Sequence, residues 1–331
     1  MKHEVIAWPV FCGLAFAVPM ALGQTVLRFS HSDQVSGARD AAAHFFARKV
    51  DLLTSGRYRV DVFCCSKLGN DPKSIEQIAL GNVDFTVSAT GSYAVQLPTL
   101  NLAMLPFLVD NYVQGWKLYD ESPWMLAQLD KAPAKGFRFL ATWEAGFRSM
   151  TTKEPLTSPA DAKGKKLRTF PNEMMRWTLE AMGFDVQVMP LPEVYLAIQK
   201  NAISGQENPV DTIFSNKFYE VAPHVTLTNH VYSPLPLAIS EKTWQKLSPE
   251  DQKAVKEAAR LTAQYSRIHV VGNDEIQLKA MARMNARINS KPQIAAFREA
   301  VQPVYVKARA KYGDDVDQLL EASELIRKRY R

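Results

Sequence analysis

Hydrophobic and polar positions in the first half of the chain switch between a period of two and a period near 3.6, which predicts strands separated by helices. Strands that alternate with helices of ordinary length indicate parallel βαβ units, so an α/β fold is expected. Asp71 followed by Pro72 predicts the start of a helix, with Asp71 as its cap. The predicted strands cover residues 25–30, 58–64 and 83–89, and the predicted helices cover 36–53 and 71–81.

The second half of the chain repeats this pattern. The stretch 231–240 is β-like but holds two prolines, which suits a segment that crosses between domains. Gly205 is expected in a turn that follows a helix. Strands are predicted at 137–143, 147–152, 166–169 and 185–189, and helices at 172–182 and 191–201.

A long helical pattern follows. It opens at Ser248-Pro249-Glu250, runs to about Ile288 and is interrupted only by Gly272. About 40 residues at a rise of ~1.5 Å give a helix of about 60 Å, longer than one small domain is wide. We therefore expect this helix to run along both domains or to bend between them, with two or three further helices after Pro292.

The first 23 residues have the pattern of a secretory signal peptide. Lys2 and His3 precede an apolar stretch over 5–20, and Ala21-Leu22-Gly23 has the form of a cleavage site. The stretch is short for a membrane span and contains two prolines, although an uncleaved anchor is the alternative. No later stretch is as long as a membrane helix. We expect residues 1–23 to be removed and the protein to be soluble in the periplasm.

The length of the chain indicates its number of domains, and its charge distribution argues against a nucleic-acid-binding protein. A chain of 331 residues is long enough for about two domains, each with its own core. The net charge of +6 is spread along the chain, whereas a nucleic-acid-binding protein would gather its basic residues in a patch. The one basic run, at 327–331, is expected to be a solvated helix end. We expect a monomer with no nucleic-acid partner.

Cysteine use is sparse. Cys12 would leave with the signal peptide, so Cys64 and Cys65 remain side by side. A bridge between neighbours cannot link distant parts of the chain, and no Cys or His spacing predicts a zinc site. The pair is either two small apolar residues at a strand end or a strained, oxidised pair.

Signatures of catalysis and of cofactor binding are absent from the sequence. It contains no nucleophile elbow, phosphate-binding loop, zinc-protease motif or dinucleotide fingerprint. The six histidines are scattered, with no pair at metal-ligand spacing. We therefore predict no catalytic residue, cofactor or metal ligand, while a Ser/His/Asp triad assembled from distant positions stays open.

Three polar clusters lie near predicted strand ends, the usual ligand position in α/β folds: 143–148, 164–170 and 204–209. A guanidinium in an apolar neighbourhood usually has a planar anionic partner. Two such arginines, Arg148 and Arg168, together with the amide of Asn208, would form a clamp for a carboxylate. The alternative for each arginine is a surface position or an internal salt bridge.

With these clusters, the sequence resembles the solute-binding proteins of tripartite ATP-independent periplasmic (TRAP) transporters, the DctP family, over about residues 25–319. Short strings agree with that family in order. They are Lys67-Leu68-Gly69-Asn70-Asp71, Ala79-Leu80-Gly81-Asn82-Val83-Asp84, Leu105-Pro106-Phe107-Leu108, Gly146-Phe147-Arg148, Lys166-Leu167-Arg168 and Gly205-Gln206-Glu207-Asn208-Pro209.

The resemblance implies a two-lobed periplasmic-binding-protein-like fold that closes on an organic acid and delivers it to TRAP membrane subunits. It implies Arg168 as the principal carboxylate contact, with Arg148 as a second contact and Asn208 as an amide contact. The chain departs from the family pattern where Phe170 stands before Pro171, beside the expected pocket. It also departs at Cys64-Cys65-Ser66, in place of a Gly-rich approach to the loop that follows.

The lobes are expected to be discontinuous, with 24–145 and 234–273 in lobe I and 146–233 and 274–331 in lobe II. His31, Glu76 and Tyr93 lie near the ends of the first three strands and are candidate contacts from lobe I, with structural hydrogen bonds as the alternative. The candidate aromatic walls, which could equally be core, are Trp143, Phe170 and Tyr232.

A transporter's binding protein that closes on its ligand is the preferred function. The alternative from another class is an exported α/β hydrolase, which needs a nucleophile and a base found together. The effector domain of a regulator is disfavoured by the signal peptide and by the missing helix-turn-helix. The identity of the acid, and whether a metal bridges it to the protein, stay open.

Overall fold

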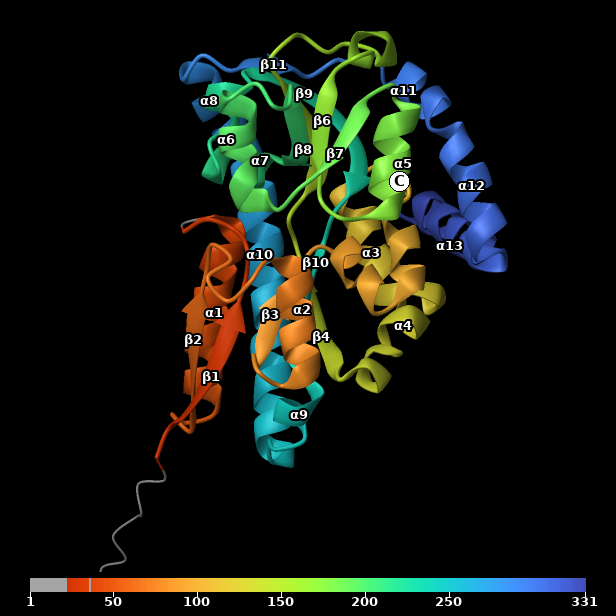
Figure 1. The fold of residues 1–331 in the computed structure, drawn as a ribbon. Helices are drawn as coiled ribbons and strands as arrows, with labels where there is room; N and C mark the ends of the chain where they lie inside the picture. The colour runs from red at the N-terminus through yellow and green to blue at the C-terminus, as the bar shows by residue number, and fades with distance from the viewer. Residues whose placement is uncertain (1–22, 36) are drawn as a thin grey trace, which may run out of the picture.

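The computed structural model describes residues 23–35 and 37–331, and these form two α/β lobes, one above the other in Figure 1. The predicted signal peptide therefore lies almost entirely outside the described residues. Within them, no helix combines the length and the apolar character needed to cross a membrane.

The lower lobe in Figure 1 is built on a five-stranded sheet with the order β2-β1-β3-β10-β4. β1 pairs in parallel with β2 and β3, whereas β10 runs antiparallel to β3 and β4. Its strands are β1 (Thr25–Ser30), β2 (Tyr58–Phe63), β3 (Phe85–Val87), β4 (Phe137–Trp143) and β10 (Leu235–Ser240). Its helices are α1 (Ala38–Leu53), α2 (Asp71–Leu80), η1 (Thr90–Val95), η2 (Pro98–Met104), α3 (Tyr112–Glu121), α4 (Pro123–Leu129), η3 (Ala132–Lys135) and α9 (Glu241–Trp244).

The upper lobe is built on a six-stranded sheet with the order β11-β9-β5-β8-β6-β7. β6 is parallel to β7 and β8, and β5 is antiparallel to β8 and β9. Its strands are β5 (Phe147–Thr152), β6 (Lys166–Thr169), β7 (Asp185–Val188), β8 (Gly205–Pro209), β9 (His224–Tyr232) and β11 (Arg287–Asn289). Its helices are η4 (Pro159–Ala162), α5 (Glu173–Ala181), η5 (Leu191–Glu193), α6 (Val194–Gln199), α7 (Val210–Ser215), α8 (Phe218–Val221) and α11 (Ile294–Ala300).

The predicted parallel βαβ units are confirmed where β1 pairs with β2 and β3 and where β6 pairs with β7, although each sheet also contains antiparallel pairs. Both sheets are mixed, because the chain crosses from β4 to β5 and from β9 to β10 without a helix that would return it in parallel. The turn predicted at Gly205 is wrong. Residues 205–209 form β8, a buried strand between β5 and β6.

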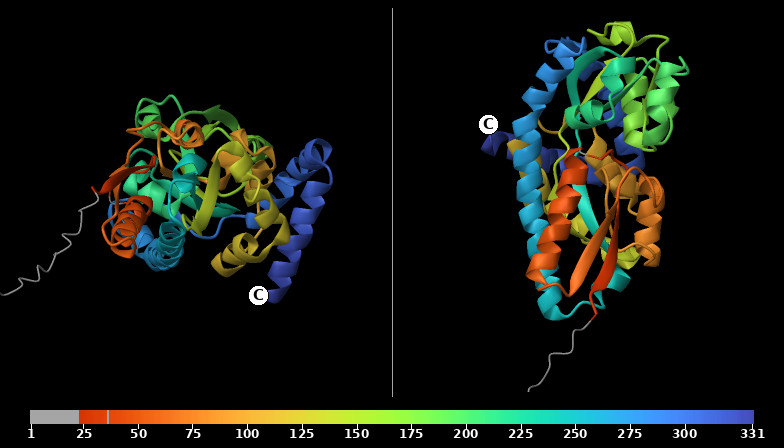
Figure 2. Two further views of the ribbon diagram at one scale, coloured as in Figure 1. Left: turned by 90° about the horizontal axis from the view of Figure 1, so that it is seen from below. Right: turned by 90° about the vertical axis from the view of Figure 1, so that its left-hand side faces the viewer.

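The predicted long helix is confirmed as α10 (Pro249–Arg283), 35 residues that run beside both lobes (Figures 1 and 2). It ends earlier than the expected position near 288. Asn285 adopts a left-handed φ of 70°, and residues 287–289 leave the helix to pair with β9.

Two more helices complete the chain, α12 (Gln302–Tyr312) and α13 (Asp314–Arg329). α12 packs on α5 of the upper lobe, and α13 packs on α3 and α4. The C-terminal segment therefore contacts elements of both halves, at the right of Figure 1.

The lobes are joined by α10 and by two short crossings, at 144–146 and 233–234.

Glu144 holds the first of these crossings in place. Its carboxylate accepts hydrogen bonds from Trp116 (2.6 Å), from the Tyr232 hydroxyl (2.8 Å) and from the backbone N–H of Gly146 (2.7 Å). Its own backbone N–H donates to Ser266 of α10 (3.0 Å). Burial raises the pKa of Glu144, and these donors oppose the rise. The carboxylate of Glu144 thus links the crossing to α3 and β9, and its backbone N–H links it to α10.

Two glycine-to-alanine substitutions should change stability in opposite directions. A Cβ at Gly205 would lie 2.1 Å from the Thr151 carbonyl oxygen, a backbone atom that β-pairing holds in place. A Cβ at Gly272, in α10, would meet nothing within 4 Å. We expect Gly205→Ala to lower the free energy of unfolding by at least about 2 kcal/mol. Gly272→Ala should raise it by about 0.5–1 kcal/mol. Urea unfolding measures both, and equal midpoints would contradict the packing at β8.

Candidate ligand-binding cleft

A small cavity lies between the two lobes, with a volume of about 40 Å³. Its walls come from the loops at the carboxyl ends of the strands of both sheets, the position at which α/β folds bind ligands. The lower lobe contributes Ser32, Asn70, Asp71, Pro72 and Ser92, and the upper lobe contributes Arg168, Phe170, Pro171, Pro190 and Leu191.

Arg168 is a buried cation without a carboxylate partner. It lies on β6 with 2% of its surface exposed, and its guanidinium donates from Nε (2.9 Å) and Nη2 (2.6 Å) to one backbone oxygen, that of Met189. No carboxylate among the described residues lies within 4.0 Å of it. Burial lowers the pKa of Arg168 to about 10, although the more distant Glu207 opposes this. The side chain remains charged at neutral pH.

Arg148, on β5, is already neutralised. Its guanidinium forms a two-pronged ion pair with the fully buried Glu207 of β8, through Nε and through Nη2 (2.9 Å). Burial alone would raise the pKa of Glu207, but Arg148 and the nearby His230 hold it at about 2. Burial lowers the pKa of His230, so this ring is neutral at neutral pH. The cleft floor therefore holds two cations and one anion.

Asn208 supports Arg148 and does not line the cavity. Its side-chain oxygen accepts a hydrogen bond from Arg148 Nη2 (3.1 Å), and its side-chain nitrogen donates to Gln206. Phe170 does line the cavity, and its ring centre lies 5.0 Å from the Arg148 guanidinium carbon. Of the three residues expected to clamp a carboxylate, only Arg168 reaches the cavity wall.

Asp71 stands on the opposite wall and was missed as a site residue. The prediction that it caps α2 is wrong, because the side chain of Asn70 accepts the capping bond from the Lys73 N–H (3.1 Å). Asp71 is instead the first helical residue, and its carboxylate is free to face the cleft. Its Oδ1 is buried without a hydrogen-bond partner and lies 3.6 Å from Arg39 Nη1. Asn and Asp are both favoured caps, and the prediction placed the cap one residue too late.

The lobe I residues predicted to contact ligand lie elsewhere. His31 is fully buried, with Nε2 3.2 Å from Asp40. Tyr93 is core, and its hydroxyl donates to the backbone oxygen of Pro236 (2.9 Å). Glu76 faces solvent on α2 and pairs with Lys73 (2.8 Å). None of the three lines the cavity.

The other two predicted aromatic walls are also internal. Trp143 stacks on Phe29 with ring centres 5.8 Å apart, inside the core of the lower lobe. Tyr232 donates to Glu144 at the crossing between lobes. Sequence could not separate these rings from Phe170, because all three follow or end strands.

Hydrogen bonds across the cleft hold the lobes together. Asp211 of α7 accepts a bond from the Ala38 N–H (2.8 Å) at the start of α1. Asn216 donates to Asp33 (3.1 Å) beside it. On the other side, Asn172 of the upper lobe donates to the Gly91 carbonyl oxygen (3.1 Å). The lobes are in a closed arrangement, with the small cavity between these contacts.

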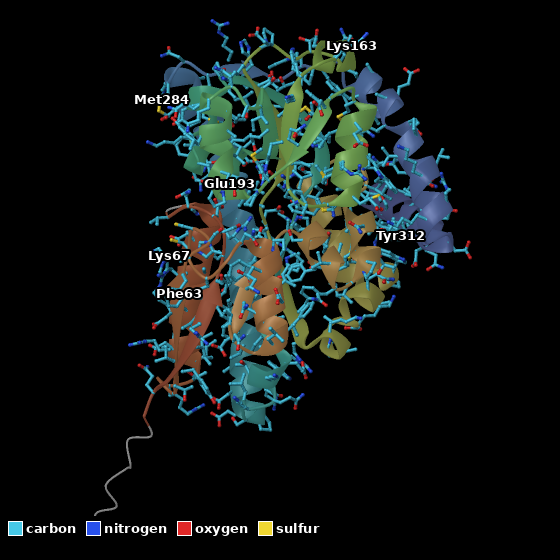
Figure 3. All side chains as sticks on the ribbon, viewed as in Figure 1. Phe63, Lys67, Lys163, Glu193, Met284 and Tyr312 are labelled. Atoms are coloured by element: carbon cyan, nitrogen blue, oxygen red, sulfur yellow. The ribbon has the colours of Figure 1, made fainter. Side chains whose placement is uncertain are left out.

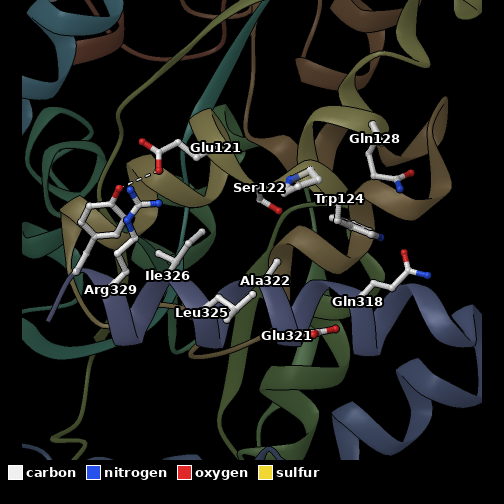
Figure 4. A pocket seen from close by; sticks show the side chains of 13 residues that line it. Glu121, Ser122, Trp124, Gln128, Gln318, Glu321, Ala322, Leu325, Ile326 and Arg329 are labelled. Carbon is white, nitrogen blue, oxygen red and sulfur yellow. Dashed lines mark hydrogen bonds between the residues drawn. The ribbon is translucent and has the colours of Figure 1, made fainter.

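A larger hollow lies away from this cleft, between α4 and α13 (Figure 4). Its volume is about 540 Å³, and its walls are mostly aliphatic, amide and acidic side chains. The one cation there, Arg329, is at an exposed helix end. A buried, unpaired cation marks the smaller cleft as the better site for an anion.

The arrangement of the two lobes defines the class of protein. Two lobes, joined by two short crossings and one continuous helix, close on a cleft whose floor has excess positive charge. This is the architecture of a solute-binding protein that closes around its ligand. Among the described residues, no group of three or more His, Cys, Asp or Glu side chains is placed to hold a metal ion.

The chain belongs to the family described as "Bacterial extracellular solute-binding protein, family 7" (DctP), whose sequence profile matches residues 29–311. It is thus a periplasmic solute-binding protein of the TRAP type, as the resemblance implied, and not an enzyme. The family works with TRAP membrane components on small organic acids. The hydrolase alternative has no support.

Individual proteins that are similar to this chain point to the same family. A solute-binding protein of Verminephrobacter eiseniae is 33% identical over 88% of each chain. The sugar acid binding protein DctPAm of Advenella mimigardefordensis, solved with galactonate, is 31% identical with a TM-score of 0.88, over 92% of this chain and 99% of its own. A TRAP solute-binding protein of Polaromonas, solved with D-erythronate, is 31% identical with a TM-score of 0.86, over 91% and 98%.

Breaking the Arg148–Glu207 pair should affect folding more than binding. Arg148→Met leaves Glu207 as a buried charge without its main partner, which typically costs about 3–5 kcal/mol of stability. The double variant Arg148→Met/Glu207→Gln removes both charges of the pair, so it should regain much of the loss. Urea unfolding of the wild type, the single variant and the double variant measures this. Equal stability of the single variant and the wild type would show that the pair carries no structural role.

Proposed function

We propose that the cleft binds a polyhydroxylated monocarboxylate, a sugar acid, between the two lobes and presents it to the membrane subunits of a TRAP transporter. The carboxylate lies on Arg168, and the hydroxyl groups lie on the lower-lobe wall around Asp71. Arg148 holds the floor of the cleft and is a neighbour of the bound carboxylate rather than its main anchor.

The charge balance of the cleft carries the proposal. A buried guanidinium costs free energy unless an anion compensates it. Glu207 is committed to Arg148, and Arg168 has only a carbonyl oxygen. A ligand carboxylate supplies the missing charge and matches the planar fork of the guanidinium with two hydrogen bonds.

The opposite wall supports a hydroxylated ligand. Asp71 Oδ1 accepts no hydrogen bond, although it lies 3.6 Å from Arg39, and Ser32 and Ser92 add hydroxyl groups that can donate or accept. Sugar hydroxyls match this set, and a second ligand carboxylate would be repelled by Asp71. The relatives solved with galactonate and D-erythronate point to the same class.

Closure is the proposed mechanism. We take the lobes as 24–145 with 234–273 and 146–233 with 274–331, and the hinge as the crossings near Glu144 and 233–234 together with the middle of α10. A ligand that touches both Arg168 and Asp71 favours the closed state, because it gains its full set of contacts only there. The closed state, acting as a monomer and without a nucleic-acid partner, then docks on the membrane subunits.

Arg168 and Asp71 should have separable effects on binding. Arg168→Ala should weaken galactonate by about 30-fold to several thousand-fold, because the ligand carboxylate loses its partner in a desolvated cleft. Arg168→Lys should recover only part, since an ammonium lacks the planar fork. Asp71→Asn should weaken galactonate by about tenfold, the loss of one charge-assisted hydrogen bond. Calorimetric titration measures all four proteins.

Succinate is the matched ligand for this experiment, since it has carboxylates and no hydroxyl. Asp71→Asn should not weaken succinate, whereas Arg168→Ala should weaken both acids. Melting curves confirm that the variants are folded. If a folded Arg168→Ala protein binds every acid within threefold of the wild type, the carboxylate is held elsewhere. If Asp71→Asn weakens both acids equally, the sugar-acid class is wrong.

A contact outside the cavity should also influence affinity, because it stabilises closure. Asp211→Ala removes the acceptor that caps α1 from the other lobe, a contribution of about 0.5–2 kcal/mol. Galactonate affinity should fall about two- to thirtyfold. Ser248→Ala is the control, because it removes a cap of α10 within a single lobe and should leave affinity unchanged.

Small-angle scattering of the wild-type protein tests closure itself. The radius of gyration should be smaller with galactonate than without it, and an unchanged scattering profile would contradict hinge closure.

A further inference from the structure

The two adjacent cysteines lie beside the cleft with their sulfur atoms in contact. Cys64 directly follows β2 and is 7% exposed, and Cys65 is partly exposed. Their Sγ atoms are 2.6 Å apart. Both thiols therefore point to the same side of the chain, although neighbours in an extended strand point to opposite sides.

The backbone of this loop imposes that arrangement. Cys65 and Ser66 both adopt left-handed φ values, 61° and 59°, which residues other than glycine rarely do. Backbone hydrogen bonds hold the turn. The Cys65 N–H donates to the carbonyl oxygen of Asp33 (3.0 Å), and the Ser66 N–H donates to the carbonyl oxygen of His31 (3.1 Å). The fold thus keeps the two thiols together at a cost in backbone energy.

The same loop carries a wall of the cleft. It runs from Cys64 to Asn70 and Asp71, and it is bonded to the segment 31–33 that includes the cavity residue Ser32. Figure 3 labels Phe63 and Lys67, on either side of the pair, at the left of the lower lobe and below Glu193 of the upper lobe. A change at the cysteines therefore acts on the ligand-facing side of the lobe.

We propose that Cys64 and Cys65 form a reversible vicinal disulfide in the periplasm, and that its reduction loosens the β2–α2 loop and weakens ligand binding. The periplasm is oxidising, so paired thiols there become disulfides. A ring between adjacent residues is strained, because their Cα atoms lie closer than in most disulfides, so it is easily reduced. The part of the proposal that concerns affinity rests on the proposed function, whereas the disulfide itself does not.

The oxidant is the disulfide of a periplasmic thiol oxidant, and the exchange balances. The more exposed Cys65, as thiolate, attacks that disulfide, and one sulfur of the oxidant leaves as a thiol. Cys64 then attacks Sγ of Cys65 and releases the second thiol. One S–S bond breaks and one forms, and two electrons and two protons pass to the oxidant. Burial raises the pKa of Cys64 to about 11, which disfavours its thiolate, so the second attack relies on the 2.6 Å separation of the two sulfur atoms.

Peptide mass tests the disulfide. Trypsin releases residues 60–67, VDVFCCSK, which contains both cysteines and no others. From exported protein isolated with a thiol-trapping reagent, this peptide should be two hydrogen atoms lighter than its reduced form and carry no trapped thiol. After treatment with a dithiol reductant it should take up two trapping groups. If the freshly isolated peptide already carries two trapped thiols, the disulfide is absent and the proposal is wrong.

Calorimetry tests the consequence for binding. Reduction should weaken galactonate by about two- to tenfold, the effect of ordering a few loop side chains on binding. Cys64→Ser/Cys65→Ser, the matched control, should bind like the reduced protein and should not respond to the reductant. If oxidised and reduced protein bind galactonate equally, the loop does not link the pair to the cleft. If neither binds any acid but the disulfide is present, the proposed function fails and the disulfide stands.

Discussion

The cleft is organised around an imbalance of buried charge. Arg148 and Arg168 lie in one desolvated floor, and a single carboxylate, that of Glu207, serves the first of them. Glu207 needs Arg148, since a buried anion without a cation would be costly. Its commitment to Arg148 is what leaves Arg168 uncompensated. The second cation therefore remains available to a ligand anion, and a binding function follows from this constraint.

The rest of the fold buries this floor and allows the lobes to move apart. The two sheets place their strand ends on opposite walls, and Glu144 fixes one crossing against α3, β9 and α10. Contacts such as that between Asp211 and Ala38 join the lobes without filling the cavity. Binding of an anion at Arg168 and closure of the lobes are therefore coupled, because each lowers the free-energy cost of the other.

Much of the fold could be predicted from the sequence because it depends on local periodicity. The bounds of β4, β5 and β6 agree with the ranges predicted from the sequence. The strand β8 could not be predicted, since its buried residues Gln206, Glu207 and Asn208 read as a polar loop until Arg148, some 60 positions earlier, is placed beside them. For the same reason, the motif resemblance singled out both Arg148 and Arg168 but could not tell which arginine was already paired. Asp71 was not considered at the cleft because it was predicted to cap α2, a position that Asn70 occupies.

The central claim is that Arg168 requires an anion, and a neutral analogue of the ligand tests it most directly. Galactonate and galactonamide have the same hydroxyl groups and differ in one group, a carboxylate in the first and an uncharged amide in the second. Calorimetric titration of the wild-type protein with both compounds, at neutral pH and one ionic strength, compares them. The charge imbalance predicts that galactonate binds at least about 30-fold more tightly. Equal affinity for the two compounds would contradict it.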